Sequence, residues 1–301
     1  MSFLLLRPQP LSVIIKVTGV IHRRNTMSGK AIAFVIEKGG TGKSTIAFNI
    51  GWELSKKSKV LLLDLDGQMA NLTYFCGVSK DDILTISDVL DGAASLESAA
   101  VPVKENLDII PADNSITDIG TPAHFDRLSR SVKLRTSQVY QLYLIEQIQM
   151  FVQSACEHYD YVLLDPNPSP NYLHTLALCS SEYVIIPVLP DAASIVSDEG
   201  TAESLNIIRE TGINEDVRVL GVLFNRYTER TNLSKQVRQI TEDFAREMET
   251  TIFRNTIRNS VVLAECVGMH TGVTDYRPSS PAAEDVRRVV SEMKRRIRNG
   301  H

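Results

Sequence analysis

The chain has 301 residues, 43% of them hydrophobic and 23% charged, and its net charge at pH 7 is −4. This composition is typical of a globular protein and excludes a disordered or membrane-embedded chain, while the length suits one large α/β domain or at most two small ones. The small net charge excludes a strong overall positive field, so a polyanion-binding surface would have to be a local cluster of Lys and Arg.

The first 26 residues form a segment that differs from the rest of the chain. Its apolar stretches, 3–6 and 11–17, are interrupted by charged residues and prolines and are too short to span a membrane. No small-residue cleavage site follows them, so a signal peptide is not expected. We predict that 1–26 is an N-terminal extension and that Met27 is the natural start, because the first predicted strand follows it almost at once.

From Met27 onward, short apolar runs alternate with longer helix-like segments, which is the pattern of βαβ units. Strands are predicted at 31–36, 60–64, 107–111, 161–165, 183–188 and 217–224. Helices are predicted at 44–57, 139–158, 197–211, 233–248 and 282–297. Because most strand runs are apolar throughout, we expect a mostly parallel central sheet with helices on both faces. The sequence therefore predicts a single α/β domain over 27–301.

The strongest chemical signal directly follows the first predicted strand and precedes the first predicted helix. It consists of Lys38, Gly39, Gly40, Thr41, Gly42, Lys43, Ser44 and Thr45. Strand, glycine-rich loop and helix is the context of a P-loop, in which backbone N–H groups and a helix N-terminus hold phosphate oxygens. We expect Lys43 to contact the β- and γ-phosphates and the Ser44 hydroxyl to hold Mg²⁺. The alternative is a glycine-rich turn that contains a lysine by chance.

This loop departs from the general P-loop at its start. The position five residues before Gly42 is Glu37 rather than glycine, and a second lysine, Lys38, opens the loop instead. The arrangement resembles the deviant Walker A motif KGGxGK[ST] of the ParA/MinD family, which includes the ParA/Soj-type partition ATPases. The resemblance implies a P-loop NTPase fold, ATP and Mg²⁺ as cofactors, ATP hydrolysis, and a homodimer in the ATP state. Lys38 would reach across that dimer to the partner's phosphates.

Two further segments are similar to motifs of the same family. LDLDGQMAN at 63–71 resembles the DxDPQ segment, with Gly67 in place of the proline. The resemblance implies that Asp66 orients or deprotonates the attacking water and that Asp64 supports the magnesium shell. Two aspartates that merely end a strand are the alternative.

The stretch YDYVLLDPNPS at 159–169 resembles the Walker B motif DYxxxDxPPS. Asp165 ends an apolar strand, where an acidic group completes the oxygen shell of Mg²⁺. Asn167 stands where the family has the first proline of its pair, so the shape of this loop is expected to differ.

The C-terminal third contains two weaker similarities. GVLFNRY at 221–227 is similar to the family's strand that ends in Asn, which implies that Asn225 reads the edge of adenine. Asn amides also cap turns, and that alternative stays open. Arg254, in TIFRN, matches a nucleotide-side loop whose usual proline is absent.

The resemblance also implies what the ATP cycle controls. Partition ATPases of this type bind non-specific DNA as ATP dimers and are released by a ParB-like protein that stimulates hydrolysis. Basic candidates for salt-sensitive phosphate contacts are Arg226, Arg230, Lys235, Arg238, Arg254, Arg258, Arg287, Arg288, Lys294, Arg295, Arg296 and Arg298. A solvated helix face balanced by acidic neighbours is the alternative for any one of them. We expect a cytoplasmic, nucleoid-associated ATPase that segregates a plasmid, a chromosome or another cargo.

Two other functions stay open. A MinD-like protein would need a membrane-surface helix, but the apolar stripe at 282–297 lacks Phe and Trp, so a docked closing helix without stable membrane insertion is expected. A P-loop metabolic ligase would need a dedicated substrate pocket, and no Cys-His or Ser-His-Asp arrangement supplies one. The cysteines, Cys76, Cys156, Cys179 and Cys266, form no CxxC pair, so neither a zinc site nor a disulfide framework is expected.

Overall fold

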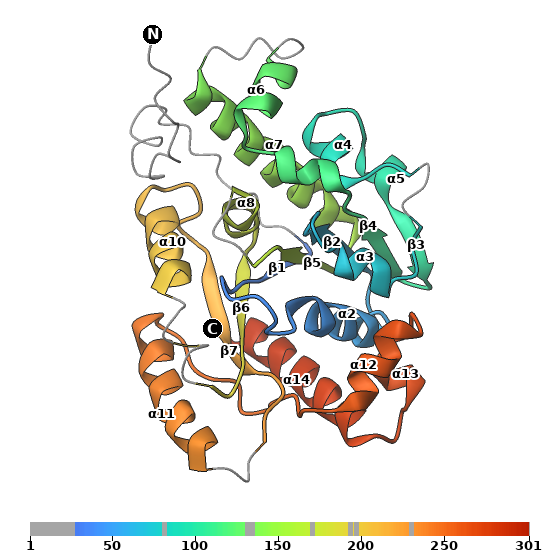
Figure 1. Cartoon of the computed structure of the whole chain (residues 1–301), viewed down its shortest axis with the longest axis vertical. Coiled ribbons are helices and arrows are strands. Elements are labelled where there is room, and N and C mark those ends of the chain that lie inside the picture. Colours follow the sequence, from blue (N-terminus) through green and yellow to red (C-terminus); the bar gives the residue numbers. More distant parts are fainter. Residues whose placement is uncertain are drawn as a thin grey trace.

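The computed structural model describes residues 28–79, 83–129, 136–168, 172–191, 195, 199–228 and 232–300. Within these residues a seven-stranded sheet lies at the centre of the molecule and helices cover both of its faces (Figure 1). The predicted extension 1–26 and Met27 lie outside the described residues.

The sheet has the order β3-β4-β2-β5-β1-β6-β7. Its strands are β1 (Lys30–Phe34), β2 (Val60–Leu65), β3 (Val101–Lys104), β4 (Leu107–Ile110), β5 (Tyr161–Pro166), β6 (Tyr183–Val188) and β7 (Arg218–Phe224). All neighbouring strands run parallel except β3 and β4. The six predicted strands are confirmed. β3 was not predicted, because this short edge strand is partly exposed and contains Pro102 instead of an apolar run.

The helices are α2 (Lys43–Leu54), α3 (Asn71–Phe75), α4 (Ile86–Leu90), α5 (Leu96–Ala99), α6 (Pro122–Leu128), α7 (Ser137–His158), α8 (Tyr172–Ser180), α10 (Glu199–Glu210), α11 (Asn232–Glu247), α12 (Val261–Gly268), α13 (Val273–Tyr276) and α14 (Pro281–Arg298), with a 3-10 helix η1 (Asn114–Asp118). The five predicted helices are confirmed with ends shifted by a few residues. Most others are too short to show a helical period, and α8 is buried on nearly every side. None of the helices in the described part of the chain is both long and apolar enough to cross a bilayer.

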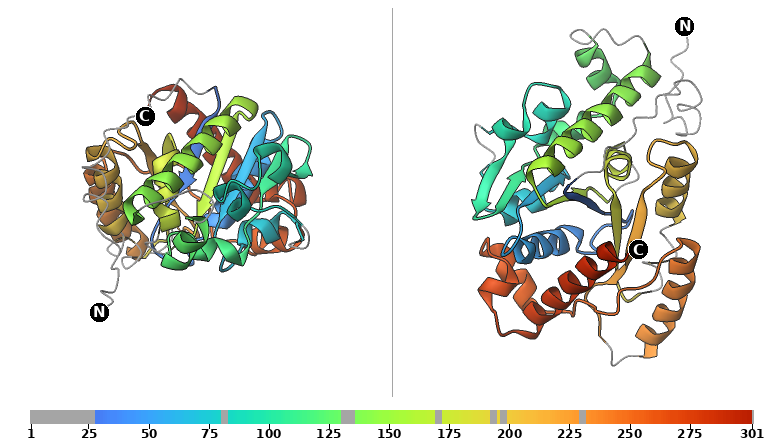
Figure 2. Two further views of the ribbon diagram at one scale, coloured as in Figure 1. Left: turned by 90° about the horizontal axis from the view of Figure 1, so that it is seen from above. Right: turned by 180° about the vertical axis from the view of Figure 1, so that it is seen from behind.

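Two cores lie on opposite faces of the sheet. Because side chains alternate along a strand, Ala31 and Ala33 face the core that α7, α8, α10 and α11 cover, whereas Ile32 and Phe34 face the core that α2, α12 and α14 cover. Figures 1 and 2 show the two groups of helices on either side of the sheet. The predicted docking of the last helix is confirmed, since Val286, Val289 and Met293 are fully buried.

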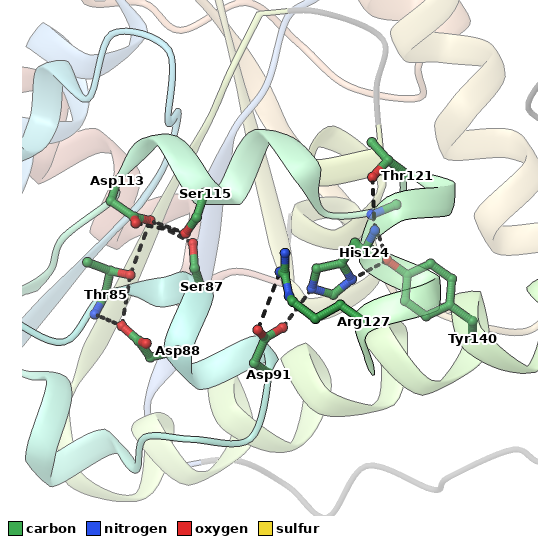
Figure 3. Close-up of polar contacts among 11 residues, drawn as sticks. Thr85, Ser87, Asp88, Asp91, Asp113, Ser115, Thr121, His124, Arg127 and Tyr140 are labelled. Carbon is green, nitrogen blue, oxygen red and sulfur yellow. Dashed lines mark hydrogen bonds and ion pairs between the residues drawn. The ribbon is translucent and has the colours of Figure 1, made fainter. Parts of the chain in front are cut away.

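Two aspartates fasten the segment that contains η1 and α6 (Figure 3). Asp113 accepts hydrogen bonds from Ser87 at 2.7 Å and from Ser115 at 2.7 and 2.9 Å. Asp91 lies 2.6 Å from Nε2 of the fully buried His124, whose Nδ1 contacts the Tyr140 hydroxyl. Burial opposes ionisation of both carboxyls, but these hydrogen bonds outweigh it and lower the pKa of each. The network therefore ties η1 and α6 to α4 and α7.

Candidate active site

The predicted P-loop joins β1 to the N-terminus of α2. Gly40 and Gly42 have φ values of +78° and +88°, which only glycine adopts without strain. A side chain at Gly42 would also collide with the Asn225 amide. Lys43 is the first residue of α2 and is buried. A loop whose glycines adopt the left-handed backbone conformation and which leads into a helix N-terminus with a buried lysine has the geometry of a phosphate-binding site.

Asp165 lies at the carboxyl end of β5, beside Asp64 at the end of β2. Burial raises the pKa of Asp165 to about 7, with a contribution from the charge of Asp64, while the charge of Lys43 and the Ser44 hydroxyl oppose the rise. Neither Asp165 oxygen has a hydrogen-bond partner of normal geometry among the described residues. A buried carboxylate without a partner is costly, so this position suits a cation.

Asp64 is held differently, because both of its oxygens are occupied by the protein. Oδ1 accepts a hydrogen bond from the Asp66 backbone N–H at 3.0 Å, and Oδ2 accepts two from Thr73, at 2.8 Å from the backbone N–H and 2.7 Å from the hydroxyl. Burial raises the pKa of Asp64 to about 6, against these hydrogen bonds. The predicted role of Asp64 in the magnesium shell stays a prediction, and its contacts hold the loop that carries Asp66.

Asp66 follows β2 and is nearly buried, and its Oδ1 has a 3.4 Å contact from the Met69 backbone N–H. The next residue explains why this loop departs from the family pattern. A Cβ at Gly67 would collide with the Ile116 side chain and the Asp113 carbonyl oxygen. Because η1 packs directly on the loop, glycine is needed there for space.

Replacing Gly67 by alanine is therefore expected to destabilise the fold by about 1–3 kcal/mol, the usual cost of overpacking, and to slow ATP hydrolysis by displacing Asp66. Thermal denaturation and phosphate release would measure the two effects. Gly268→Ala is the matched control, because a Cβ there meets no atom within 4 Å in the structure. A Gly67→Ala protein as stable and as active as the wild type would contradict this packing.

Lys38 is the first residue of the P-loop motif, and its side chain is partly exposed. Its Nζ is 3.2 Å from Oδ1 of Asp191, and both side chains are partly exposed. Gly39, the next residue, packs near Pro168, so the start of the P-loop lies beside the segment that follows β5. In the single chain the predicted trans-acting lysine is thus paired with a carboxylate of its own subunit.

Asn225 links the end of β7 to the P-loop. Its Nδ2 donates a 2.8 Å hydrogen bond to the Thr41 carbonyl, and the side chain is buried. The role of this amide in reading adenine stays a prediction.

A cavity of about 640 Å³ lies near the end of β7, and Tyr227 contributes to it. The cavity is lined by Tyr227, Thr228, Arg254, Asn255, Thr256, Arg258, Asn259, Asp285 and Arg288.

Carboxylates of α14 hold the cavity wall that contains Arg254. Glu292 accepts hydrogen bonds from the backbone N–H groups of Arg254 and Asn255, at 2.9 and 3.0 Å. Asp285 binds the Arg258 guanidinium, with Nε at 2.6 Å. The last helix therefore sets the position of the predicted nucleotide-side loop.

The prediction that Arg296 contacts phosphates at the surface was wrong. Its guanidinium is buried and donates to the carbonyl oxygens of Leu220 and Ile252, at 2.6 and 2.7 Å, and to Glu292.

His174 is a buried residue of α8 that the sequence analysis did not single out, because it stands within a mostly apolar segment. Burial, followed by the charge of Lys43, lowers the pKa of His174 to about 3, so the ring is neutral beside the P-loop.

Comparisons with known proteins place this site in a family. Residues 29–219 match a family described as an AAA domain. The virulence plasmid ParA family protein pGP5-D of Chlamydia psittaci is 30% identical over 271 residues, which is 89% of this chain and 95% of the relative. The chromosome-partitioning ATPase Soj of Thermus thermophilus is 32% identical over 270 residues, or 89% and 96%. The chain belongs to the ParA family of ATPases.

The fold likeness extends to a solved structure. The complex of Cyanothece McdA with ATP superposes with a TM-score of 0.71 at 16% identity, over 90% of this chain and 96% of that one. The ParA-family site of the present chain fits ATP and Mg²⁺ on its own geometry. Gly40 and Gly42, with their positive φ values, and the buried Lys43 suit a triphosphate. The Asp165 oxygens, which have no hydrogen-bond partner of normal geometry in the described part of the chain, suit a hydrated cation.

Proposed function

We propose that this ParA-family ATPase works as a nucleotide-gated homodimer that binds non-specific DNA in the cytoplasm, at the nucleoid. Its ATP hydrolysis, stimulated by a ParB-like partner, would act as a timer that positions a plasmid, a chromosome or another large cargo. The observation that carries the proposal is the P-loop with its additional lysine, Lys38, whose partly exposed side chain pairs with Asp191 in the single chain.

Each residue of the site has its own proposed role in ATP hydrolysis. Lys43 would contact the β- and γ-phosphates. Ser44 and Asp165 would hold Mg²⁺, which would neutralise charge on the phosphate oxygens. Asp66 orients the attacking water, and Lys38 of the partner subunit adds positive charge at the phosphates. Asn225, whose amide contacts the Thr41 carbonyl of the P-loop, would read the edge of adenine.

The cavity at the carboxyl end of β7 is the surface that we assign to DNA. Arg254 and Arg288 are exposed and come from different elements, and exposed Arg226 immediately precedes the cavity residue Tyr227. Arg288 pairs with Glu284 on α14 at 2.9 Å, so Arg226 and Arg254, which come from two other segments, are the main source of positive charge on this surface. Two other basic candidates, Arg230 and the side chain of Lys235, lie outside the described residues.

DNA binding tests the proposal. Random-sequence duplex is expected to bind in the presence of ATP, but not with ADP or without nucleotide, and to bind more weakly at higher salt. Arg254→Ala should weaken this binding several-fold by removing about one phosphate contact. Arg218→Ala, an exposed arginine at the opposite end of β7, is the control. Absence of DNA binding, with liposome binding or small-substrate turnover instead, would favour the MinD-like or metabolic alternative.

A further inference from the structure

Four buried oxygen atoms at the P-loop and at the end of β5 have no hydrogen-bond partner of normal geometry among the described residues, although the Ser44 hydroxyl is close enough to Asp165 to favour its charged form. They are Thr41 Oγ1, both carboxylate oxygens of Asp165, and Asn167 Oδ1. The Asn167 side chain is 3% exposed, so water does not reach it freely. A buried polar group left without a partner costs about 1–3 kcal/mol, and such groups are rare unless a ligand completes them.

Asn167 is placed next to the phosphate loop. It comes directly after β5, two residues beyond Asp165. The following residue, Pro168, lies beside Gly39 of the P-loop. Asn167 is therefore the buried residue that links the strand end carrying Asp165 to the segment beside the P-loop.

The chemistry of these oxygen atoms limits which group can be their missing partner. The carboxylate oxygens of Asp165 and the carboxamide oxygen of Asn167 only accept hydrogen bonds, so the group that completes them is a hydrogen-bond donor or a cation. Mg²⁺ keeps several of its waters when it binds beside phosphates, and those waters are strong donors. A neutral carboxamide also adds an acceptor without adding negative charge beside Asp64 and Asp165, whose proximity already disfavours ionisation.

We propose that Asn167 is a positioning residue for ATP hydrolysis, whose Oδ1 accepts a hydrogen bond from a water in the shell of the Mg²⁺ that Asp165 holds. The inference rests on Mg²⁺ being the cofactor and adds a residue to its site. The proline that the family carries at this position has no side-chain acceptor, so this chain gains a contact that such a loop lacks.

The test measures how ADP binding to the full chain depends on Mg²⁺, by titration calorimetry. Asn167→Ala is expected to raise the Mg²⁺ concentration at half-maximal effect by about tenfold, as loss of a partner to a metal ligand does, while the Kd for ADP in EDTA stays unchanged. Asn167→Asp keeps an acceptor and should restore the wild-type midpoint or lower it. These results would support the role.

Asn214→Ala is the matched control for loss of a buried amide. Asn214 donates to the carbonyl oxygens of Leu178 and Ser181, at 2.7 and 2.8 Å, before β7 begins. It should lower the melting temperature without moving the Mg²⁺ midpoint. An unchanged midpoint in Asn167→Ala, or an equal loss of ADP affinity with and without Mg²⁺, would overturn the inference. If the Kd of the wild-type chain for ADP did not depend on the Mg²⁺ concentration, the assignment of Mg²⁺ as cofactor would be overturned, and this inference with it.

Discussion

Replacing Asp66 by alanine is expected to slow ATP hydrolysis by about 100-fold or more while ATP still binds. The three aspartates near the site are held in different ways. Both oxygens of Asp64 accept hydrogen bonds from Thr73 or from the Asp66 N–H, whereas the Asp165 oxygens have no hydrogen-bond partner of normal geometry among the described residues. The Asp66 carboxylate has a long contact with the Met69 N–H, so it is the one best able to orient a water.

The measurement is phosphate release at saturating ATP, together with the Kd for ATP. Asp66→Asn is the closest matched variant, because the amide keeps the size of the side chain but accepts no proton. It should be nearly as slow as Asp66→Ala and as stable as the wild type. Wild-type turnover in either variant would remove Asp66 from the proposed mechanism and leave the water to another group.

Replacing Lys38 by alanine is expected to abolish ATP-dependent dimer formation and to leave nucleotide binding by the single chain largely intact. In the single chain the Lys38 ammonium pairs with Asp191, and both side chains are partly exposed. Such pairs contribute about 0–1 kcal/mol to folding, so the variant should fold normally. Light scattering with ATP, with ADP and without nucleotide would report the oligomeric state.

Lys30→Ala is the matched control for the loss of this lysine. Lys30 pairs with Glu182 at the same 3.2 Å and is about as exposed as Lys38, but it lies at the start of β1, away from the P-loop. The control should still form dimers with ATP. Dimer formation by Lys38→Ala would show that Lys38 does not act across the interface.

The sequence predicted those parts of the site that are local in the chain. The loop from Lys38 to Thr45 is contiguous, and the flanking strand and helix have clear patterns, so its conformation follows from neighbours in sequence. Asp165 and Asp66 could be placed for a similar reason, since each lies at or just after the end of an apolar strand of a parallel sheet and those ends meet at one edge.

The parts that sequence could not predict depend on partners distant in the chain. Arg296 stands among several basic residues of α14, and only tertiary packing shows that it is buried beneath the carbonyls of Leu220 and Ile252. Likewise, the need for glycine at position 67 arises from η1, which packs against it. The burial of Arg296 and the need for glycine at position 67 are both set by the packing of separate elements. Neither a charge pattern nor a turn signal in the sequence contains that information.

The contacts of α14 with Arg254 and Asn255 have a consequence for synthesis of the protein. The P-loop emerges from the ribosome early, whereas Glu292 lies close to the C-terminus. Domains form as translation proceeds, but a wall that needs a carboxylate from the final helix cannot be fixed before that helix is released. A nascent chain would therefore carry its phosphate loop well before the cavity at the end of β7 takes its final shape.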